Sequence, residues 1–368
     1  MYAARMTAIV STGRGARNSA ASETNSQQGL KRQLMKQTAR KNVKPSVNGP
    51  ASKEDFLELF RQMHLIRKFE EACGEQYGKG NIRGFLHLYI GEEAIAVGSI
   101  AALNPGDYIA THYRDHGHAL ARGLDTNRVM AELFGRATGT SKGKGGSMHL
   151  FDAARGFMGG HAIVGGQLPL AAGLALACQY LENGRIAVVY FGDGAVNQGV
   201  FHETMNLAAV WELPLIFFLE NNLYGMGSAV ERTRAGGMDI YPIAASYGIE
   251  AVVIDGMDVL AVREATAEAA KKVRSGSGPK FIEAKTYRFG GHSMADPAKY
   301  RDHAELEYWM AKDPLLTFPK MLVDREIATS SEIENVREAV AEAVATAVKF
   351  ASDSPQPATS ELFTDVYA

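Results

Sequence analysis

The chain has little cysteine and no long hydrophobic run. Cys73 and Cys178 are the only cysteines among 368 residues, and both lie in apolar stretches that we expect to be helical. Such thiols suit a reducing compartment and argue against a disulfide framework or a cysteine-rich metal site. The longest strongly apolar stretch, residues 168–178, is too short to span a bilayer. We therefore expect no membrane segment.

Acidic residues are almost missing from the first 53 positions. Residues 1–53 hold ten Lys and Arg against one acid, a charge of +9, whereas the remainder holds 29 against 40, a charge of −11. The segment also lacks apolar periodicity and the apolar core of a secretory signal, so we predict a disordered basic tail. We expect a cytoplasmic location; the alternative is a transit peptide for the mitochondrial matrix or a plastid. Without interleaved aromatics, the tail gives no basis for expecting nucleic-acid binding.

Residues 54–368 have the patterns of a single α/β domain. Apolar, β-branched runs occur at residues 186–191 and 213–219, and residues 197–211 between them repeat apolar side chains at helical spacing. Strand, helix, strand is the parallel crossover unit. Further strand-like runs at residues 251–255 and 280–287 flank an alanine-rich helix. We predict a doubly wound parallel sheet with helices on both faces.

Helix-capping patterns occur near both ends of this domain. Ser52 and Asp55 can cap a first helix, and Ser331 and Glu334 fit a capping box before a last one. One face of the last helix is apolar, which predicts a core or subunit contact; it comprises Ile333, Val336, Val340, Val344 and Val348.

Two polar residues end the first two strand-like runs. Asp193 lies in a Gly-Asp-Gly turn after the first run, and Asn222 ends an Asn-Asn pair after the second, with 26 residues between the two motifs. The carboxyl ends of parallel strands meet at one edge of a sheet. Carboxylate and amide oxygens suit Mg²⁺, which shares its coordination sphere with substrate phosphates. The sequence therefore predicts a magnesium and diphosphate site.

Five further motifs occur in order along the chain: GFLHLYIGEEA (84–94), THYRDHGHAL (111–120), SKGKGGSMH (141–149), ENNLYGMG (220–227) and GGHSMADPAKYR (290–301). The Gly-Asp-Gly turn followed by the Asn-Asn pair resembles the thiamine diphosphate fingerprint, and the five motifs extend the resemblance along the chain. The chain is similar, from about Phe56 to its end, to the alpha subunit of the decarboxylating component of 2-oxo acid dehydrogenase complexes. The resemblance is strongest to the pyruvate dehydrogenase type.

This resemblance implies a set of cofactor-binding residues. Mg²⁺ would be held by Asp193, Asn222 and the backbone carbonyl of Tyr224. The diphosphate would be bound by Tyr113, Arg114, His292 and the backbone N–H groups of Gly194 and Ala195, which we expect to open the following helix. Backbone groups of Ala162 and Val164 would contact the aminopyrimidine ring; the family often has glycine at the first of these positions.

The resemblance also implies where substrate chemistry occurs. Thiamine diphosphate is the nucleophile toward the 2-oxo acid, and His87 would stabilise developing charge or assist proton or acyl transfer. A purely structural histidine is the alternative. Arg288 and His292 would order the loop of residues 289–301 around the cofactor. Ser293 matches a serine that kinases modify in eukaryotic relatives, but Lys299 replaces a second one, so we predict gating without native phosphorylation.

Three more histidines lie in THYRDHGHAL. We interpret His112, His116 and His118 as loop or helix polarity, because no cysteine or second cluster in the sequence accompanies them to make a zinc site.

The resemblance implies partners as well. No segment resembles the domain that carries the pyrimidine-activating glutamate, so we expect a separate beta subunit in an α₂β₂ heterotetramer, and a lipoyl acyltransferase core. The expected reaction is oxidative decarboxylation of pyruvate and reductive acetylation of lipoyl groups. Acetoin or branched-chain 2-oxo acid dehydrogenase is the alternative within this chemistry. The alternative outside it is a non-enzymatic binding protein that uses the basic tail.

Overall fold

The computed structural model describes residues 52–366. Almost all of the predicted basic tail lies outside these residues. The central element is a six-stranded sheet in the order β2-β1-β3-β4-β8-β7, with every neighbouring pair parallel. Its strands are β1 (Tyr108–His112), β2 (Phe157–His161), β3 (Ala187–Gly192), β4 (Leu215–Asn221), β7 (Glu250–Asp255) and β8 (Lys280–Lys285). A small antiparallel ribbon joins β5 (Tyr224–Gly225) to β6 (Ser228–Ala229).

The strand order reverses between β1 and β3. From β1 the chain moves outward to β2, and it then returns to place β3 on the other side of β1 before continuing to β4. In open parallel sheets, ligands bind outside the carboxyl ends of the strands at this switch point. The ends of β1 and β3 are followed by Tyr113 and Asp193, so the topology brings these two predicted site residues to one edge.

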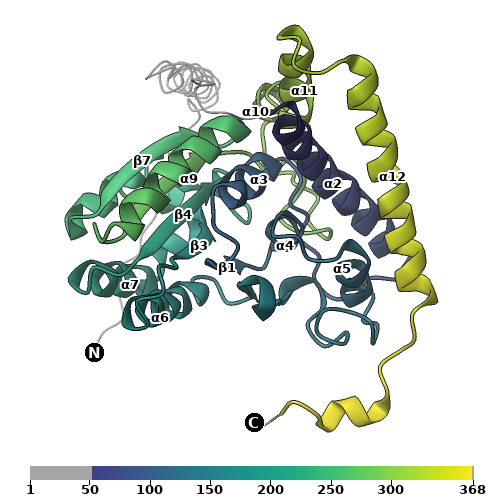
Figure 1. Ribbon diagram of the computed structural model, residues 1–368, viewed down its shortest axis with the longest axis horizontal. Coiled ribbons are helices and arrows are strands. Elements are labelled where there is room, and N and C mark those ends of the chain that lie inside the picture. Colours follow the sequence, from purple (N-terminus) through teal and green to yellow (C-terminus); the bar gives the residue numbers. More distant parts are fainter. Residues whose placement is uncertain (1–51, 367–368) are drawn as a thin grey trace, which may run out of the picture. The chain divides into compact units, whose positions relative to one another are not determined.

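Helices cover both faces of the sheet (Figure 1). One face is covered by α2 (Lys53–Gly78), α3 (Glu93–Ala101), α4 (His116–Ala121) and α9 (Val259–Arg274); the other by α6 (Gln167–Tyr180), α7 (Gly199–Val210) and the 3₁₀ turn η4 (Tyr241–Tyr247). Alternate residues of a strand enter different cores: Val188 and Tyr190 pack on the α2 side, and Val189 and Phe191 on the α6 side. The prediction of a doubly wound parallel sheet is confirmed.

The remaining helices surround this layered centre. They are α5 (Thr126–Leu133), α8 (Val230–Thr233), α10 (His303–Met310), α11 (Pro314–Asp324) and α12 (Ser330–Asp353), with 3₁₀ turns η1 (Gly146–Met148), η2 (Ala153–Arg155), η3 (Asp193–Asn197) and η5 (Thr359–Phe363). The long helix α12 packs along α2 and against α5 (Figure 1). Its apolar face contributes to the core on the α2 side. Among the helices of residues 52–366, none is long and apolar enough to cross a membrane.

One of the two predicted helix caps is confirmed. Ser52 and Asp55 form a reciprocal capping box at the start of α2. The prediction for α12 is wrong by two residues, because Thr329 is the N-cap and pairs with Glu332, while Ser331 lies inside the first turn. Thr329 and Glu332 have the same spacing and chemistry as the predicted pair, so the pattern alone cannot choose between them. Cys73 and Cys178 are buried free thiols, as predicted.

Candidate active site

The three predicted metal ligands lie together at the switch-point edge. Asp193 begins η3 directly after β3, and Asn222 follows the last residue of β4. The β5 ribbon packs against η3: a Cβ built on Gly225 would lie 3.7 Å from Oδ2 of Asp193. Burial raises the pKa of Asp193 to about 7, although the backbone N–H of Asn222 favours the ionised form. A bound cation would offset this cost of burying the carboxylate.

The amide of Asn222 has a defined orientation. Its Nδ2 donates to Oε1 of Glu92 at 3.0 Å, and its Oδ1 accepts from the backbone N–H of Tyr224 at 3.3 Å. A carboxylate can only accept and a backbone N–H can only donate, so the two ends of the amide are distinguished. The hydroxyl of Tyr224 donates to Glu305 at 2.7 Å. The backbone carbonyl of Tyr224, the group predicted to bind the metal, takes no part in this hydrogen bond.

Gly194 and Ala195 do not open the following α-helix as predicted. They lie in the five-residue 3₁₀ turn η3, and α7 begins only at Gly199. The chain changes direction directly after β3, and η3 is the tight turn in which it does so. The two residues still sit beside Asp193 at the carboxyl end of the strand.

Arg114 joins two segments that are distant in sequence. It is buried, and its guanidinium donates to the backbone carbonyls of Leu88 at 2.7 Å and His292 at 2.9 Å. Its Nε lies 3.6 Å from Oε2 of Glu92. The predicted diphosphate-binding arginine therefore holds the GFLHLYIGEEA segment against the loop that contains His292.

His87, Tyr113 and His292 form an aromatic cluster beside Arg114. The ring centroids of His87 lie 4.6 Å from Tyr113 and 5.1 Å from His292, and the rings of Tyr113 and His292 are 5.7 Å apart. Burial, helped by the positive charge of Arg114, lowers the pKa of His87 to about 3 and that of His292 to about 4. Both imidazoles are therefore neutral near pH 7. Among residues 52–366, Nδ1 of each ring has no hydrogen-bond partner.

Arg288 adds buried positive charge to the same region. Its guanidinium donates to the hydroxyl of Tyr300 at 3.0 Å and to the carbonyl of Gly290 at 3.3 Å. Burial, together with the nearby Arg114 and Arg301, lowers its pKa to about 10. These contacts support its predicted role in ordering the loop. The concentration of guanidinium groups, with unpaired imidazole nitrogens beside them, fits an anionic ligand.

The predicted pyrimidine-binding residues form an exposed edge of the site. Ala162 and Val164 lie in the loop between β2 and α6, at the same end of the sheet as the other predicted residues. Val164 is exposed, as is the neighbouring Ile163, whose exposed fraction is 75%.

The interpretation of His112, His116 and His118 as loop or helix polarity is wrong. His112 and His118 donate from Nε2 to the buried carboxylate of Glu220, and His116 is hydrogen-bonded through Nδ1 to Glu70 at 2.9 Å. Burial alone would raise the pKa of Glu220, but His118 and His112 lower it below its usual range. A sequence signal existed, because Glu220 is a charged residue that directly follows five apolar residues of a strand.

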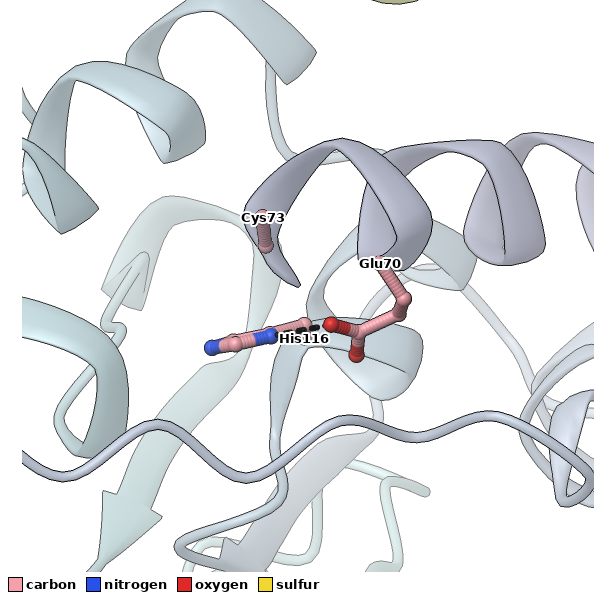
Figure 2. Close-up of side chains that lie close together, drawn as sticks. All are labelled: Glu70, Cys73 and His116. Atoms are coloured by element: carbon pink, nitrogen blue, oxygen red, sulfur yellow. Dashed lines mark hydrogen bonds and ion pairs between the residues drawn. The ribbon is translucent and has the colours of Figure 1, made fainter. Parts of the chain in front are cut away.

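Contrary to the sequence interpretation, a cysteine does lie near one of these histidines. Glu70, Cys73 and His116 place one potential ligand atom each within 4.8 Å of one another (Figure 2). Their polar groups are already used: Glu70 also accepts from the backbone N–H of Tyr89, and Nε2 of His116 bonds to Ser147. Burial and Glu70 raise the pKa of the Cys73 thiol, which keeps it protonated and a poor ligand. This cluster is a structural link between α2 and α4.

The doubly wound sheet and the buried polar groups at its switch point place the chain in the class of α/β proteins with a ligand site at the carboxyl ends of parallel strands. Residues 61–360 match the family described as Dehydrogenase E1 component. The chain belongs to this family.

Several similar proteins agree with this assignment. The chain is 49% identical to the pyruvate dehydrogenase E1 component subunit alpha of Rhizobium meliloti, over 86% of this chain and 90% of the relative. It is 46% identical to the protein of the same name from Rickettsia felis, over 89% and 99% of the two chains. The relative of the same name from Zymomonas mobilis is 49% identical over 86% and 89%.

Proposed function

We propose that the chain is the alpha subunit of a thiamine diphosphate-dependent pyruvate dehydrogenase. Together with a beta subunit, it would catalyse oxidative decarboxylation of pyruvate and reductive acetylation of lipoyl groups on an acyltransferase core. The observation that carries this proposal is the similarity, over most of both chains, to relatives that share one name. The positions of the predicted site residues at the sheet edge support it independently.

The described residues fit thiamine diphosphate and Mg²⁺. Asp193 and Asn222, with the carbonyl of Tyr224, offer oxygen ligands of the kind that Mg²⁺ prefers. Arg114, Tyr113 and His292 would neutralise and hold the diphosphate. When bound, thiamine diphosphate supplies the nucleophilic carbon and the electron sink for decarboxylation of a 2-oxo acid.

The chain's own side chains would act on charge and on protons. With its pKa lowered to about 3, the imidazole of His87 is neutral, and it can donate a hydrogen bond to an oxygen that becomes negative during the reaction. His292, equally neutral, lies against both His87 and Tyr113. Arg288 holds the loop that carries His292 through its hydrogen bonds to Gly290 and Tyr300.

We propose that the beta subunit covers the outer surface of α6 and α7. These neighbouring helices, with the residue that caps the end of α7, expose large apolar side chains, namely Leu170, Leu176, Tyr180, Leu207, Val210 and Trp211. Contiguous exposed apolar surface of this kind marks interaction sites. The surface continues into the exposed loop of Ile163 and Val164, which leads directly into α6. A subunit seated there would supply the missing wall of the site.

Reconstitution tests this function. The chain, co-expressed with the beta subunit encoded in the same genome, should decarboxylate pyruvate only when thiamine diphosphate and Mg²⁺ are present. It should also acetylate a lipoyl domain. Val210→Arg should weaken the assembly, measured by size-exclusion chromatography, while the matched exposed-face change Leu316→Arg on α11 should leave it unchanged. A fully active isolated chain would contradict the need for a beta subunit.

Substrate comparison separates the alternatives. An acetoin or branched-chain 2-oxo acid dehydrogenase would use acetoin or 3-methyl-2-oxobutanoate with a higher kcat/KM than pyruvate. We expect pyruvate to be preferred, and a clear preference for either rival substrate would reassign the enzyme within the family.

A further inference from the structure

Glu220 connects several elements beneath the candidate site. It lies near the end of β4, two residues before Asn222, and only 1% of it is exposed. Its carboxylate accepts hydrogen bonds from the hydroxyl of Tyr89, from Nε2 of His112, and from Nε2 of His118 at 3.0 Å. A buried carboxylate that accepts three hydrogen bonds is held in one position.

His112 connects Glu220 to the segment that is predicted to bind the diphosphate. It is the last residue of β1 and directly precedes Tyr113 and Arg114. While its Nε2 donates to Glu220, its Nδ1 accepts the backbone N–H of Arg114 at 3.0 Å. A neutral imidazole with the proton on Nε2 satisfies both hydrogen bonds.

The link crosses a strand. β1 and β4 are not neighbours, because β3 lies between them, and Glu220 is in register with Gly192 of β3. Gly192 directly precedes Asp193. The hydrogen bond from His112 to Glu220 therefore spans β3, which leads to the metal carboxylate, and joins the end of β1, next to the diphosphate-binding pair, to the end of β4, next to the metal amide.

We propose that Glu220, acting through His112, is a positioning residue that fixes Tyr113 and Arg114 for the anionic cofactor. This inference rests on the proposed function. Without the carboxylate, the imidazole loses its anchor and the turn that holds the N–H of Arg114 can shift. Partners that orient ligand-binding groups in this way are typically worth about 10- to 100-fold in affinity.

Binding of thiamine diphosphate to the alpha–beta assembly, measured by calorimetry with saturating Mg²⁺, is the test. Glu220→Gln should raise the Kd at least about tenfold. In His112→Asn, the shorter amide can still accept the N–H of Arg114 but cannot reach Glu220, so its Kd should rise similarly. If Glu220 acts through His112, the double variant should bind no more than about twofold more weakly than Glu220→Gln, because coupled residues are non-additive.

Asp107→Asn is the matched control. Asp107 is a buried carboxylate at the opposite end of β1, where it accepts the N–H of Ile186 at 3.1 Å and pairs with Arg274. This variant should lower the Tm but leave the Kd unchanged.

Several results would overturn the inference: wild-type affinity in Glu220→Gln, multiplicative effects in the double variant, or equal weakening by Asp107→Asn. If Glu220→Gln does not assemble, His112→Asn decides, and wild-type affinity in that variant overturns the inference. A wild-type assembly that binds no thiamine diphosphate would overturn the proposed function together with this inference. Wild-type binding with unaffected variants would overturn the inference alone.

Discussion

Asp193 is the only charged group among the three predicted metal ligands. Its carboxylate is buried beside the β5 ribbon, and replacing it with alanine removes the charge that attracts Mg²⁺. We expect Asp193→Ala to abolish Mg²⁺-dependent binding of thiamine diphosphate to the alpha–beta assembly, and Asn222→Ala to weaken it less. Calorimetry measures both. Wild-type affinity in Asp193→Ala would show that the metal lies elsewhere.

The ring of His87 contacts Tyr113 and His292, and its Nδ1 has no hydrogen-bond partner among the described residues. We therefore expect His87→Ala to leave cofactor affinity unchanged while lowering kcat by about 10²- to 10³-fold, the usual cost of removing one donor that stabilises developing charge. Steady-state kinetics at saturating cofactor, paired with calorimetry, provides the measurement. Lost cofactor affinity with unchanged kcat would mean that His87 is misassigned.

At the residue scale, the sequence predicted where the site residues lie better than it predicted which residues they contact. Asp193 and Asn222 were predictable because strand ends in a parallel sheet must share an edge. The bonds of His116 to Glu70 and of His112 to Glu220 were not, because the partners are 46 and 108 residues apart. Local spacing carries no information about such pairs, which only the packing of α2 and α4 against the sheet brings together.

At the element scale, the loop of residues 289–301 is the part that we expect to respond to ligand. Asp296 organises it by accepting the backbone N–H groups of His292 at 2.6 Å and Ala298 at 2.9 Å and the hydroxyl of Tyr300 at 2.7 Å. Arg114 holds the carbonyl of His292 from outside the loop. Bound diphosphate would add a further anchor at His292 and close the site.

Limited trypsin digestion tests this gating. Thiamine diphosphate with Mg²⁺ should slow cleavage at the exposed Lys299, while cleavage at Lys79, exposed at the end of α2, should keep the same rate and serves as the internal control. Equal cleavage of Lys299 with and without cofactor would refute gating. Mass spectrometry of the protein from its native host should find no phosphate on Ser293.

Hydrophobic patterning predicted the strands and helices well, but it predicted their ends less well. β3, β4, β7 and β8 lie within one or two residues of the predicted runs. For β3 and β4 the reason is that buried strands are continuous apolar segments. The turn η3 and the true cap of α12 were missed. Both depend on where the backbone changes direction, and at the start of α12 neighbouring Ser, Thr and Glu residues offer nearly equal caps.

At the scale of the whole molecule, the neutral histidines of the site affect stability. The pKa values of His87 and His292 are lowered to about 3 and 4, whereas an unfolded chain has histidine pKa values near 6.5. Between about pH 6.5 and 4 the unfolded state binds protons that the folded state does not, so the free energy of unfolding falls as the pH falls. The stabilisation is fully present above pH 6.5.

Urea denaturation at pH 7 and pH 5 measures this dependence. His87→Asn should lose less free energy of unfolding between the two pH values than wild type, because one titrating group is gone. His303→Asn, at an exposed position, should retain the wild-type difference. An identical pH dependence in His87→Asn and wild type would contradict the lowered pKa.

The pairing of α12 with α2 has a consequence for how the protein is made. Lys53 forms an ion pair with Glu332, and Arg337 lies over the ring of Phe60, so the first described helix completes its packing only against the last long one. During translation α2 leaves the ribosome early, and the part of its apolar surface that packs against α12 stays uncovered until nearly the whole polypeptide has been synthesised. Exposed surface of this kind is what chaperones bind. A nascent chain stalled before α12 would therefore be held or degraded in the cell, even though its site-forming strands are already complete.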